Sequence, residues 1–167
     1  MTNDKSEKEK SCLEDLKEDY SELKEKFELP SFDEMNKDFQ IEKIAEIETD
    51  YLIREIRKIT SDKFSNYLRL IEAILNPVNS PMFVFSVVKT LGVNEKNQLM
   101  EMYKKLFIKE IDVMELDMVF DEEKEADFIK NSFEVWQEIK EEMIKIIKFI
   151  KKNLDNKFEA NGGNYFG

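Results

Sequence analysis

The stretch NPVNSPMFVFSVVKTLG, residues 76–92, is the least charged part of a chain in which 38% of the residues are charged. Ser80 and Pro81 have the chemistry of a helix start, and Gly92 has that of a helix stop. Between them, almost every side chain is apolar, which is typical of a helix surrounded by other helices. The sequence therefore predicts a central apolar helix at 82–91.

The composition favours helices in the rest of the chain as well. Four Gly and three Pro in 167 residues leave few tight turns for a β-sheet. A chain of this length is of ordinary size for one domain. We expect an all-α fold, a compact bundle of five to seven helices packed around 82–91, with an N-terminal helical arm.

The spacing of apolar residues and the positions of helix-breaking Pro and Gly divide the chain into four parts. These are a disordered N-terminus at 1–10, a helical arm at 11–28, a helical bundle domain at 29–158 and a flexible C-terminal tail at 159–167. In the arm, apolar residues recur at spacings of three and four. This pattern fits a helix that packs on its own domain, and it also fits the seam of a two-chain coiled coil.

Capping signals mark the helix starts inside the bundle. Ser31 and Glu34 have the spacing of a capping box, and Asp121 can cap the last helix. Residues 41–75 form a near-continuous helix or two helices, because only the possible cap at 60–62 interrupts the apolar stripe.

The charge pattern limits the partners. The chain has a formal net charge of −11, which disfavours general binding to nucleic acids or anionic membranes. Residues 76–109 are the exception, with five Lys against two Glu. There is one cysteine, no apolar run of membrane-spanning length and a polar N-terminus without the features of a signal peptide. We expect a cytoplasmic protein with no membrane association.

The absence of histidine excludes the usual His-dependent nucleophile systems and zinc motifs. The few glycines form no phosphate-binding loop. The nine carboxylates of residues 110–127 are interpreted as a solvated acidic turn, with an ion site or a docking surface for a basic partner as alternatives. Arg54, Arg57 and Lys58 are interpreted as a solvated, salt-bridged face. We therefore expect no enzyme activity and no catalytic, cofactor-binding or metal-binding residues.

Residues 82–109 resemble a helix-turn-helix, with Gly92 in the turn. Such a motif needs polar side chains early in its second helix to contact base edges, and basic ones to contact phosphates. The residues in those places are Lys96, Asn97, Gln98, Lys104 and Lys105. The apolar first helix and Glu95 at the tip argue against DNA binding, and an ordinary corner between two helices fits the pattern equally well.

Two aromatic residues, Tyr165 and Phe166, follow a Gly-Gly pair in the tail. They are candidates for docking on a partner or on the chain's own domain, although a tail of this composition is more typical of disorder.

Several short segments together resemble a group of small all-helical archaeal proteins with no assigned activity. The segments are LPSFDE at 29–34, YLIREIRKI at 51–59, YKKLF at 103–107, EADFI at 125–129 and NYFG at 164–167. The resemblance implies an archaeal, cytoplasmic protein and assigns no functional residue.

The sequence thus favours a non-enzymatic protein-interaction or structural module, in which a homodimer could form through the first or the last heptad-like helix. The alternative is a nucleic-acid-associated regulator that uses 82–109.

Overall fold

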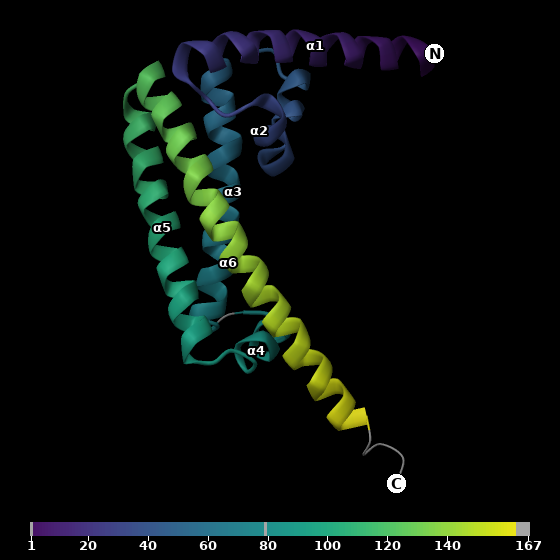
Figure 1. Ribbon diagram of the computed structural model, residues 1–167, viewed down its shortest axis with the longest axis vertical. Helices are drawn as coiled ribbons and strands as arrows, with labels where there is room; N and C mark the ends of the chain where they lie inside the picture. Colours follow the sequence, from purple (N-terminus) through teal and green to yellow (C-terminus); the bar gives the residue numbers. More distant parts are fainter. Residues whose placement is uncertain (1, 79, 163–167) are drawn as a thin grey trace. The chain divides into compact units, whose positions relative to one another are not determined.

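The computed structural model describes the backbone of residues 2–78 and 80–162 and the side chains of 12–78 and 80–156. Within these residues it contains six α-helices, one 3₁₀-helix and no β-strand (Figure 1). The helices are α1 (Thr2–Phe27), α2 (Phe32–Phe39), η1 (Ile41–Glu46), α3 (Leu52–Leu75), α4 (Met82–Val88), α5 (Val93–Met118) and α6 (Glu122–Gly162). The prediction of an all-α fold is confirmed.

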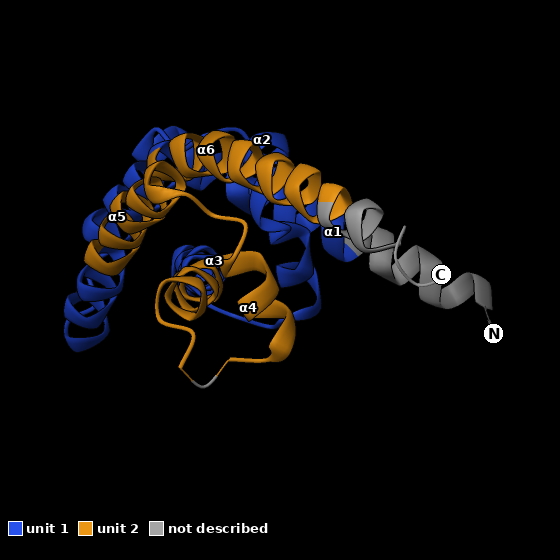
Figure 2. Cartoon of the chain, turned by 90° about the horizontal axis from the view of Figure 1, so that it is seen from below, with its two compact units in different colours: residues 1–64, 109–134 blue, residues 65–108, 135–167 orange. Residues whose placement is uncertain are grey.

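The chain forms two compact units (Figure 2). Unit 1 comprises residues 1–64 and 109–134, and unit 2 comprises residues 65–108 and 135–167. Helices α3, α5 and α6 each contribute residues to both units. The unit boundaries therefore lie inside helices, where no change in composition marks them in the sequence.

In unit 1, α1 lies across the first turns of α3, beside α2 and η1 (Figure 1). Leu16 and Tyr20 of α1 are buried, as are Met35 of α2 and Ile44 of η1. From Leu16 toward its C-terminus, the first helix therefore packs on its own unit. Its backbone is helical from Thr2, so the helix includes most of the 1–10 segment that was expected to be disordered.

The predicted cap at Ser31 is present. The Glu34 N–H donates to Ser31 Oγ at 3.3 Å, and the Ser31 N–H donates to the Glu34 carboxylate at 3.0 Å. Asp121 likewise accepts from the N–H groups of Glu123 and Lys124, at 3.0 and 3.2 Å. Local hydrogen bonding fixes both helix starts, which is why the sequence identified them.

Of the two interpretations of 41–75, one near-continuous helix or two helices, the structure has two helices, but the break does not lie at 60–62. The chain forms η1, leaves helical geometry at Ile47 and begins α3 at Leu52. By contrast, α3 passes through the expected cap at 60–62 without a break. The hydroxyls of Thr60 and Ser61 donate to carbonyl groups of the preceding turn, Ile56 and Lys58, so they do not end the helix.

The prediction of a central, buried apolar helix at 82–91 is also wrong in its length and its burial. Helix α4 ends at Val88, and within it only Val84 is fully buried, at 3% exposure. Met82 and Phe83 are 83% and 65% exposed. A helix of seven residues makes barely two turns, so packing on one side leaves its other side chains in water.

The buried part of unit 2 is formed instead by three helices, with Ile71 and Ile74 from α3, Leu99, Met102 and Leu106 from α5, and Ile139 and Ile146 from α6. Tyr67 of α3 meets Trp136 of α6 edge to face, with ring centroids 5.0 Å apart. The backbone of α6 is helical to Gly162, which extends it into the predicted tail at 159–167.

Candidate functional site

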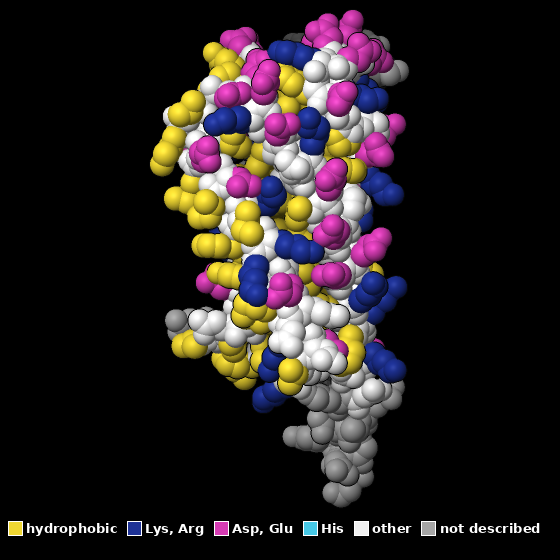
Figure 3. Space-filling model, turned by 60° about the vertical axis from the view of Figure 1, so that its left-hand side comes forward, with side chains coloured by type: hydrophobic (Ala, Val, Ile, Leu, Met, Phe, Trp, Pro, Cys, Tyr) yellow, Lys and Arg dark blue, Asp and Glu magenta, His cyan; other side chains and the backbone are white. Residues whose placement is uncertain are grey.

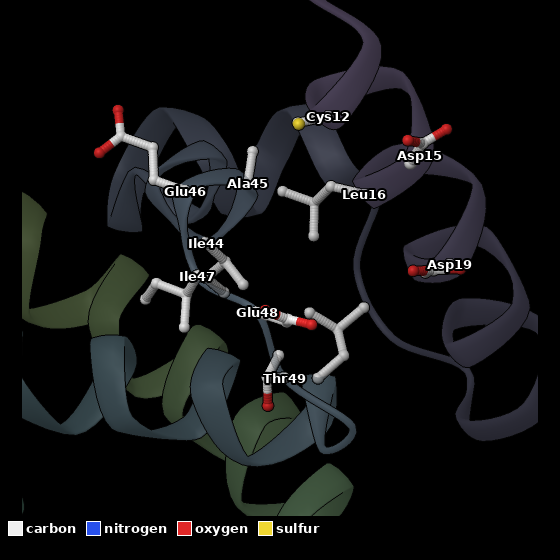
Figure 4. Close-up of a pocket in the computed structure, with 11 residues that line it drawn as sticks. Cys12, Asp15, Leu16, Asp19, Ile44, Ala45, Glu46, Ile47, Glu48 and Thr49 are labelled. Atoms are coloured by element: carbon white, nitrogen blue, oxygen red, sulfur yellow. The ribbon is translucent and has the colours of Figure 1, made fainter. Parts of the chain in front are cut away.

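A hollow of about 420 Å³ lies in unit 1 between α1 and the segment from η1 to the start of α3. Leu16 from α1 and Ile44 and Ile47 from the facing segment point toward one another across it (Figure 4). Ile47 is 48% exposed. The floor of the hollow is therefore apolar, and Ile47 is its half-exposed member.

A second hollow of about 320 Å³ lies farther along α1. The two hollows share three lining residues, Asp19, Thr49 and Leu52, so they are neighbours along α1. We call the two together the acidic groove. Its α1 wall extends from Cys12 to Lys26, about 21 Å at a rise of 1.5 Å per residue.

The charge of the groove is strongly one-sided. Its lining carboxylates are Asp15, Asp19, Glu22, Glu46, Glu48, Asp50 and Glu122. The first hollow has no Lys or Arg among its lining residues, and the second has only Lys26. Lys26 already forms an ion pair with Glu122 at 2.6 Å. The groove therefore combines an apolar floor with an uncompensated negative rim.

The sequence did not identify this groove. Helix α1 does show an apolar seam with acidic residues beside it, since Asp15, Asp19 and Glu22 follow a spacing of four and three. The facing wall is formed by the non-helical segment after η1, which the sequence analysis placed inside a helix. Because that segment was assigned to a helix, the sequence analysis could not predict that it faces α1 across a groove.

A second cluster of charged groups in unit 1 is centred on a buried pair, Arg57 and Glu125. Arg57 Nε donates to Glu125 Oε2 at 2.8 Å, and Arg57 Nη2 donates to Asp117 Oδ1 at 2.7 Å. Arg57 is 3% exposed and Glu125 is 0% exposed. The guanidinium of Arg54 lies 4.4 Å from the ring centroid of Phe120 and donates to the other Glu125 oxygen. This network joins α3, α5 and α6 within unit 1.

The interpretations of Arg57 as part of a solvated face and of Glu125 as part of a solvated acidic turn are therefore wrong. The predicted local pairing does occur nearby, between Lys58 and Glu55 at 2.7 Å. Arg57 lies one position earlier on α3 and faces the interior, where Glu125 satisfies its charge. Residues 68 positions apart in the sequence form this contact, so local spacing gave no sign of it.

Among the residues that the structure describes, no group of three or more His, Cys, Asp or Glu side chains is arranged to hold a metal ion. The described helices also include none with the length and apolar character needed to cross a membrane.

The predicted nucleic-acid contacts are spread around α5. Lys96, Asn97 and Gln98 are exposed within its first two turns. At 100° per residue, Lys96 and Lys105 lie on opposite sides of the helix. Lys105 Nζ donates to Glu138 at 2.8 Å, which raises the pKa of Lys105, and Lys104 pairs with Glu101 at 2.7 Å. The five residues do not form one basic face.

The turn before α5 also differs from the expected one. The N–H of Gly92 donates to the Glu95 carboxylate at 3.0 Å, so Gly92 precedes the first turn of α5 and Glu95 caps it. A Cβ atom at Gly92 would lie 2.7 Å from that carboxylate oxygen. The glycine therefore provides space for the cap. The candidate docking residues Tyr165 and Phe166 lie outside the described residues.

Comparison of the chain with protein-family models, with curated proteins and with solved structures gave no match. The resemblance to small all-helical archaeal proteins stays an expectation from the sequence.

Proposed function

We propose that the chain is a non-enzymatic protein-interaction module whose acidic groove binds a basic, amphipathic helical segment of another protein. The observation that supports this most directly is the combination of an apolar floor, of which Ile47 is half exposed, with a rim of seven carboxylates and one already paired Lys. A helix laid into such a groove buries its apolar side on the floor and places Lys or Arg beside the rim.

The dimensions of the groove suit this occupant. A wall of about 21 Å matches a helix of roughly 14 residues, or four turns. The floor residues Leu16, Ile44, Ile47 and Leu52 include one, Ile47, whose side chain is half exposed in the free chain. Covering Ile47 with an apolar partner residue removes that surface from water.

The exposure of the rim favours recognition over catalysis. Asp15, Asp19, Glu46 and Glu48 are all exposed. Solvated carboxylates can steer and orient a basic partner, whereas electrostatic catalysis depends on fixed charges in a water-excluded site.

The proposal can be tested by fluorescence anisotropy with three labelled synthetic peptides of about 14 residues. The first is an amphipathic Leu/Lys helix, the second replaces Lys by Glu, and the third keeps Lys but replaces Leu by Ser. At about 0.15 M salt we expect the Leu/Lys peptide to bind at least about tenfold more tightly than either of the others. Equal binding of the Leu/Lys and Ser/Lys peptides would contradict the proposed role of the apolar floor in binding.

Matched variants separate the groove from the general negative charge of the chain. Asp15→Asn with Asp19→Asn should weaken binding of the Leu/Lys peptide about tenfold or more. Glu18→Gln with Glu25→Gln removes the same charge from α1 but changes no lining residue of the two hollows, and it should have little effect. Equal losses in the two double variants would contradict the proposal.

A second candidate is association with nucleic acid through the start of α5, and the exposure of Lys96, Asn97 and Gln98 favours it. Its test is a labelled random-sequence DNA duplex titrated with the protein over a range of salt. Binding that falls with Lys96→Gln but not with the groove variants would support this candidate over the groove. Absence of binding at low salt would exclude it.

A further inference from the structure

The two compact units differ strongly in charge. Unit 1 has 15 Lys or Arg against 29 Asp or Glu, whereas unit 2 has 11 Lys or Arg against 8 Asp or Glu. The acidic groove belongs to unit 1. Since the other unit has an excess of positive charge, a second copy of the chain can supply a basic partner for this groove.

The positive charge of unit 2 is concentrated on α6, in residues 144–152. This segment, IKIIKFIKK, consists of five apolar residues and four Lys. No other part of the chain has four Lys or Arg within nine residues without an Asp or Glu. In Figure 3, Lys and Arg side chains lie along the lower right-hand edge of the view, directly above the grey end of the chain into which α6 leads. The segment therefore has the composition of a basic, amphipathic helix.

The sides of this segment differ in burial. Ile146 is buried, whereas Ile144 and Ile147 are 45% and 41% exposed. The four Lys side chains are also exposed, namely Lys145, Lys148, Lys151 and Lys152. At 100° per residue, the two exposed Ile and the four Lys lie within an arc of about 160°, and we call these six residues the basic face of α6. Carboxylates return on this side of α6 one turn before and one turn after the segment, at Glu141 and Asp155.

The basic face matches the first hollow of the acidic groove in length and in charge. Residues 144–152 extend about 12 Å along α6, and the α1 wall of the first hollow, from Cys12 to Asp19, extends about 11 Å. The lining of that hollow contains four exposed carboxylates and no Lys or Arg, the four being Asp15, Asp19, Glu46 and Glu48. Four Lys can therefore face four carboxylates, while the exposed Ile side chains of α6 cover the half-exposed Ile47.

These charges are free to form new pairs. Within residues 12–78 and 80–156, whose side chains the structure describes, neither the four Lys of the basic face nor the four carboxylates of the first hollow form an ion pair. Contact between the two surfaces therefore breaks no ion pair among these residues. A single exposed pair contributes little, so the contact depends on several pairs together with the covered apolar residues.

We propose that the acidic groove of one copy of this chain binds the basic face of α6 of a second copy. This inference rests on the proposed function, because it names the partner of the same groove. The contact is heterologous, since the groove and the basic face are different surfaces. It joins the first helix of one copy to the last helix of the other, whereas a coiled-coil homodimer pairs the same helix of both copies. Assemblies therefore grow with concentration or close as a ring of two or more copies.

The contribution of the basic face is tested by sedimentation equilibrium of the full chain at about 0.15 M salt. The wild type should exceed the monomer mass at about 100 μM. Lys148→Gln with Lys152→Gln should raise the dissociation constant about tenfold or more. The matched control, Lys96→Gln with Lys104→Gln, removes the same charge from exposed positions of unit 2 and should have little effect. A wild type that stays monomeric at millimolar concentration, or equal losses in the two double variants, overturns the proposal.

A mixture of two variants tests whether the groove of one copy meets the basic face of another. Asp15→Asn with Asp19→Asn leaves the basic face intact, and Lys148→Gln with Lys152→Gln leaves the groove intact. Each variant alone should associate about tenfold more weakly than the wild type, whereas an equimolar mixture should form one-to-one pairs with close to wild-type affinity. Such a pair does not extend, because its remaining groove and its remaining face are both altered. Sedimentation velocity measures the pairs, and no recovery in the mixture would contradict the heterologous contact.

The apolar part of the contact is tested by Ile147→Ser. This variant removes apolar surface that the groove would cover, and it should weaken self-association by about threefold or more. Ile108→Ser is the matched control, because Ile108 is 58% exposed and lies in the same unit on another helix. Equal association of the two variants would show that Ile147 is not covered in the assembly.

The peptide experiments on the groove separate this inference from the proposed function. If the Leu/Lys peptide binds the groove while the wild type stays monomeric, this inference fails and the proposed function stands. If the wild type does associate, an excess of the Leu/Lys peptide should return it to monomers, because the peptide occupies the same groove. Assemblies that persist when the groove is saturated with this peptide would overturn the inference.

Discussion

In helix α4 of unit 2 and in the Arg57–Glu125 pair of unit 1, burial does not follow from the polarity of the side chains alone. Helix α4 consists of apolar residues and one Ser, yet Val84 is its one fully buried member. Arg57 and Glu125 are charged, yet both are buried and joined by a 2.8 Å hydrogen bond. An apolar side chain is buried only where another surface covers it, and a charge is buried only where a partner replaces its water.

Removing one member of the buried pair should have the largest effect. Glu125→Ala leaves the buried guanidinium of Arg57 with Asp117 alone, and we expect it to lower the free energy of unfolding by about 3–5 kcal/mol. Glu123→Ala, in the same first turn but exposed, should cost about 1 kcal/mol or less through the helix dipole. Urea titration of both variants measures the difference, and equal losses would show that the pair is not the cause.

Truncation within α4 should separate its covered residue from its exposed ones. Val84→Ala removes buried methyl groups and should lower the free energy of unfolding by about 2 kcal/mol. Phe83→Ala removes a much larger side chain that is 65% exposed, and it should change the value by no more than about 0.5 kcal/mol. The same urea titration compares them. A greater loss for Phe83→Ala would mean that the exposed side of α4 is covered in solution.

Tyr20 provides an intermediate case, a buried polar group with a single partner. Its hydroxyl donates to the Pro30 carbonyl oxygen at 2.8 Å, so Tyr20→Phe should cost about 1 kcal/mol. Burial, with a smaller contribution from Glu34, raises the pKa of Tyr20 well above its usual range. The unfolded chain releases this proton near pH 10, whereas the folded chain keeps it. The contribution of Tyr20 is therefore complete below about pH 10 and is lost as pH rises further.

The measurement is the difference in unfolding free energy between wild type and Tyr20→Phe across pH 8 to 11. The difference should shrink above about pH 10 and stay constant below it. A constant difference throughout would contradict the assignment of the raised pKa to this buried hydroxyl.

The smallest effect is expected at the exposed cap of α2. The hydrogen bond from the Ser31 hydroxyl to the Glu34 carboxylate, together with one from the Ser31 backbone, lowers the pKa of Glu34. The charged carboxylate therefore stabilises the fold above its ordinary pKa of about 4.3, and this contribution is lost as pH falls below that value. Ser31→Ala should raise the pKa of Glu34 toward its ordinary value, as followed by NMR titration. An unchanged titration curve for Glu34 in this variant would contradict the cap.

The prediction of the fold succeeded where the signal was local. Ser31 and Asp121 cap the helices that the sequence assigned to them, because a cap depends on residues two or three positions apart. The prediction failed at 47–51, where the chain leaves helical geometry without Gly or Pro to mark the change. One wall of the acidic groove is formed by this segment, so that error also concealed the candidate site.

The sequence by itself determined that the chain is all-α, where its capped helices begin and that its net charge is strongly negative. These properties depend on composition and on neighbours within one helical turn. The tertiary structure alone decided that Arg57 meets Glu125, that α4 is mostly exposed and that α1 faces the segment after η1. Each of these depends on which surfaces meet across long sequence separations, and an apolar or charged side chain has no property that specifies its distant partner.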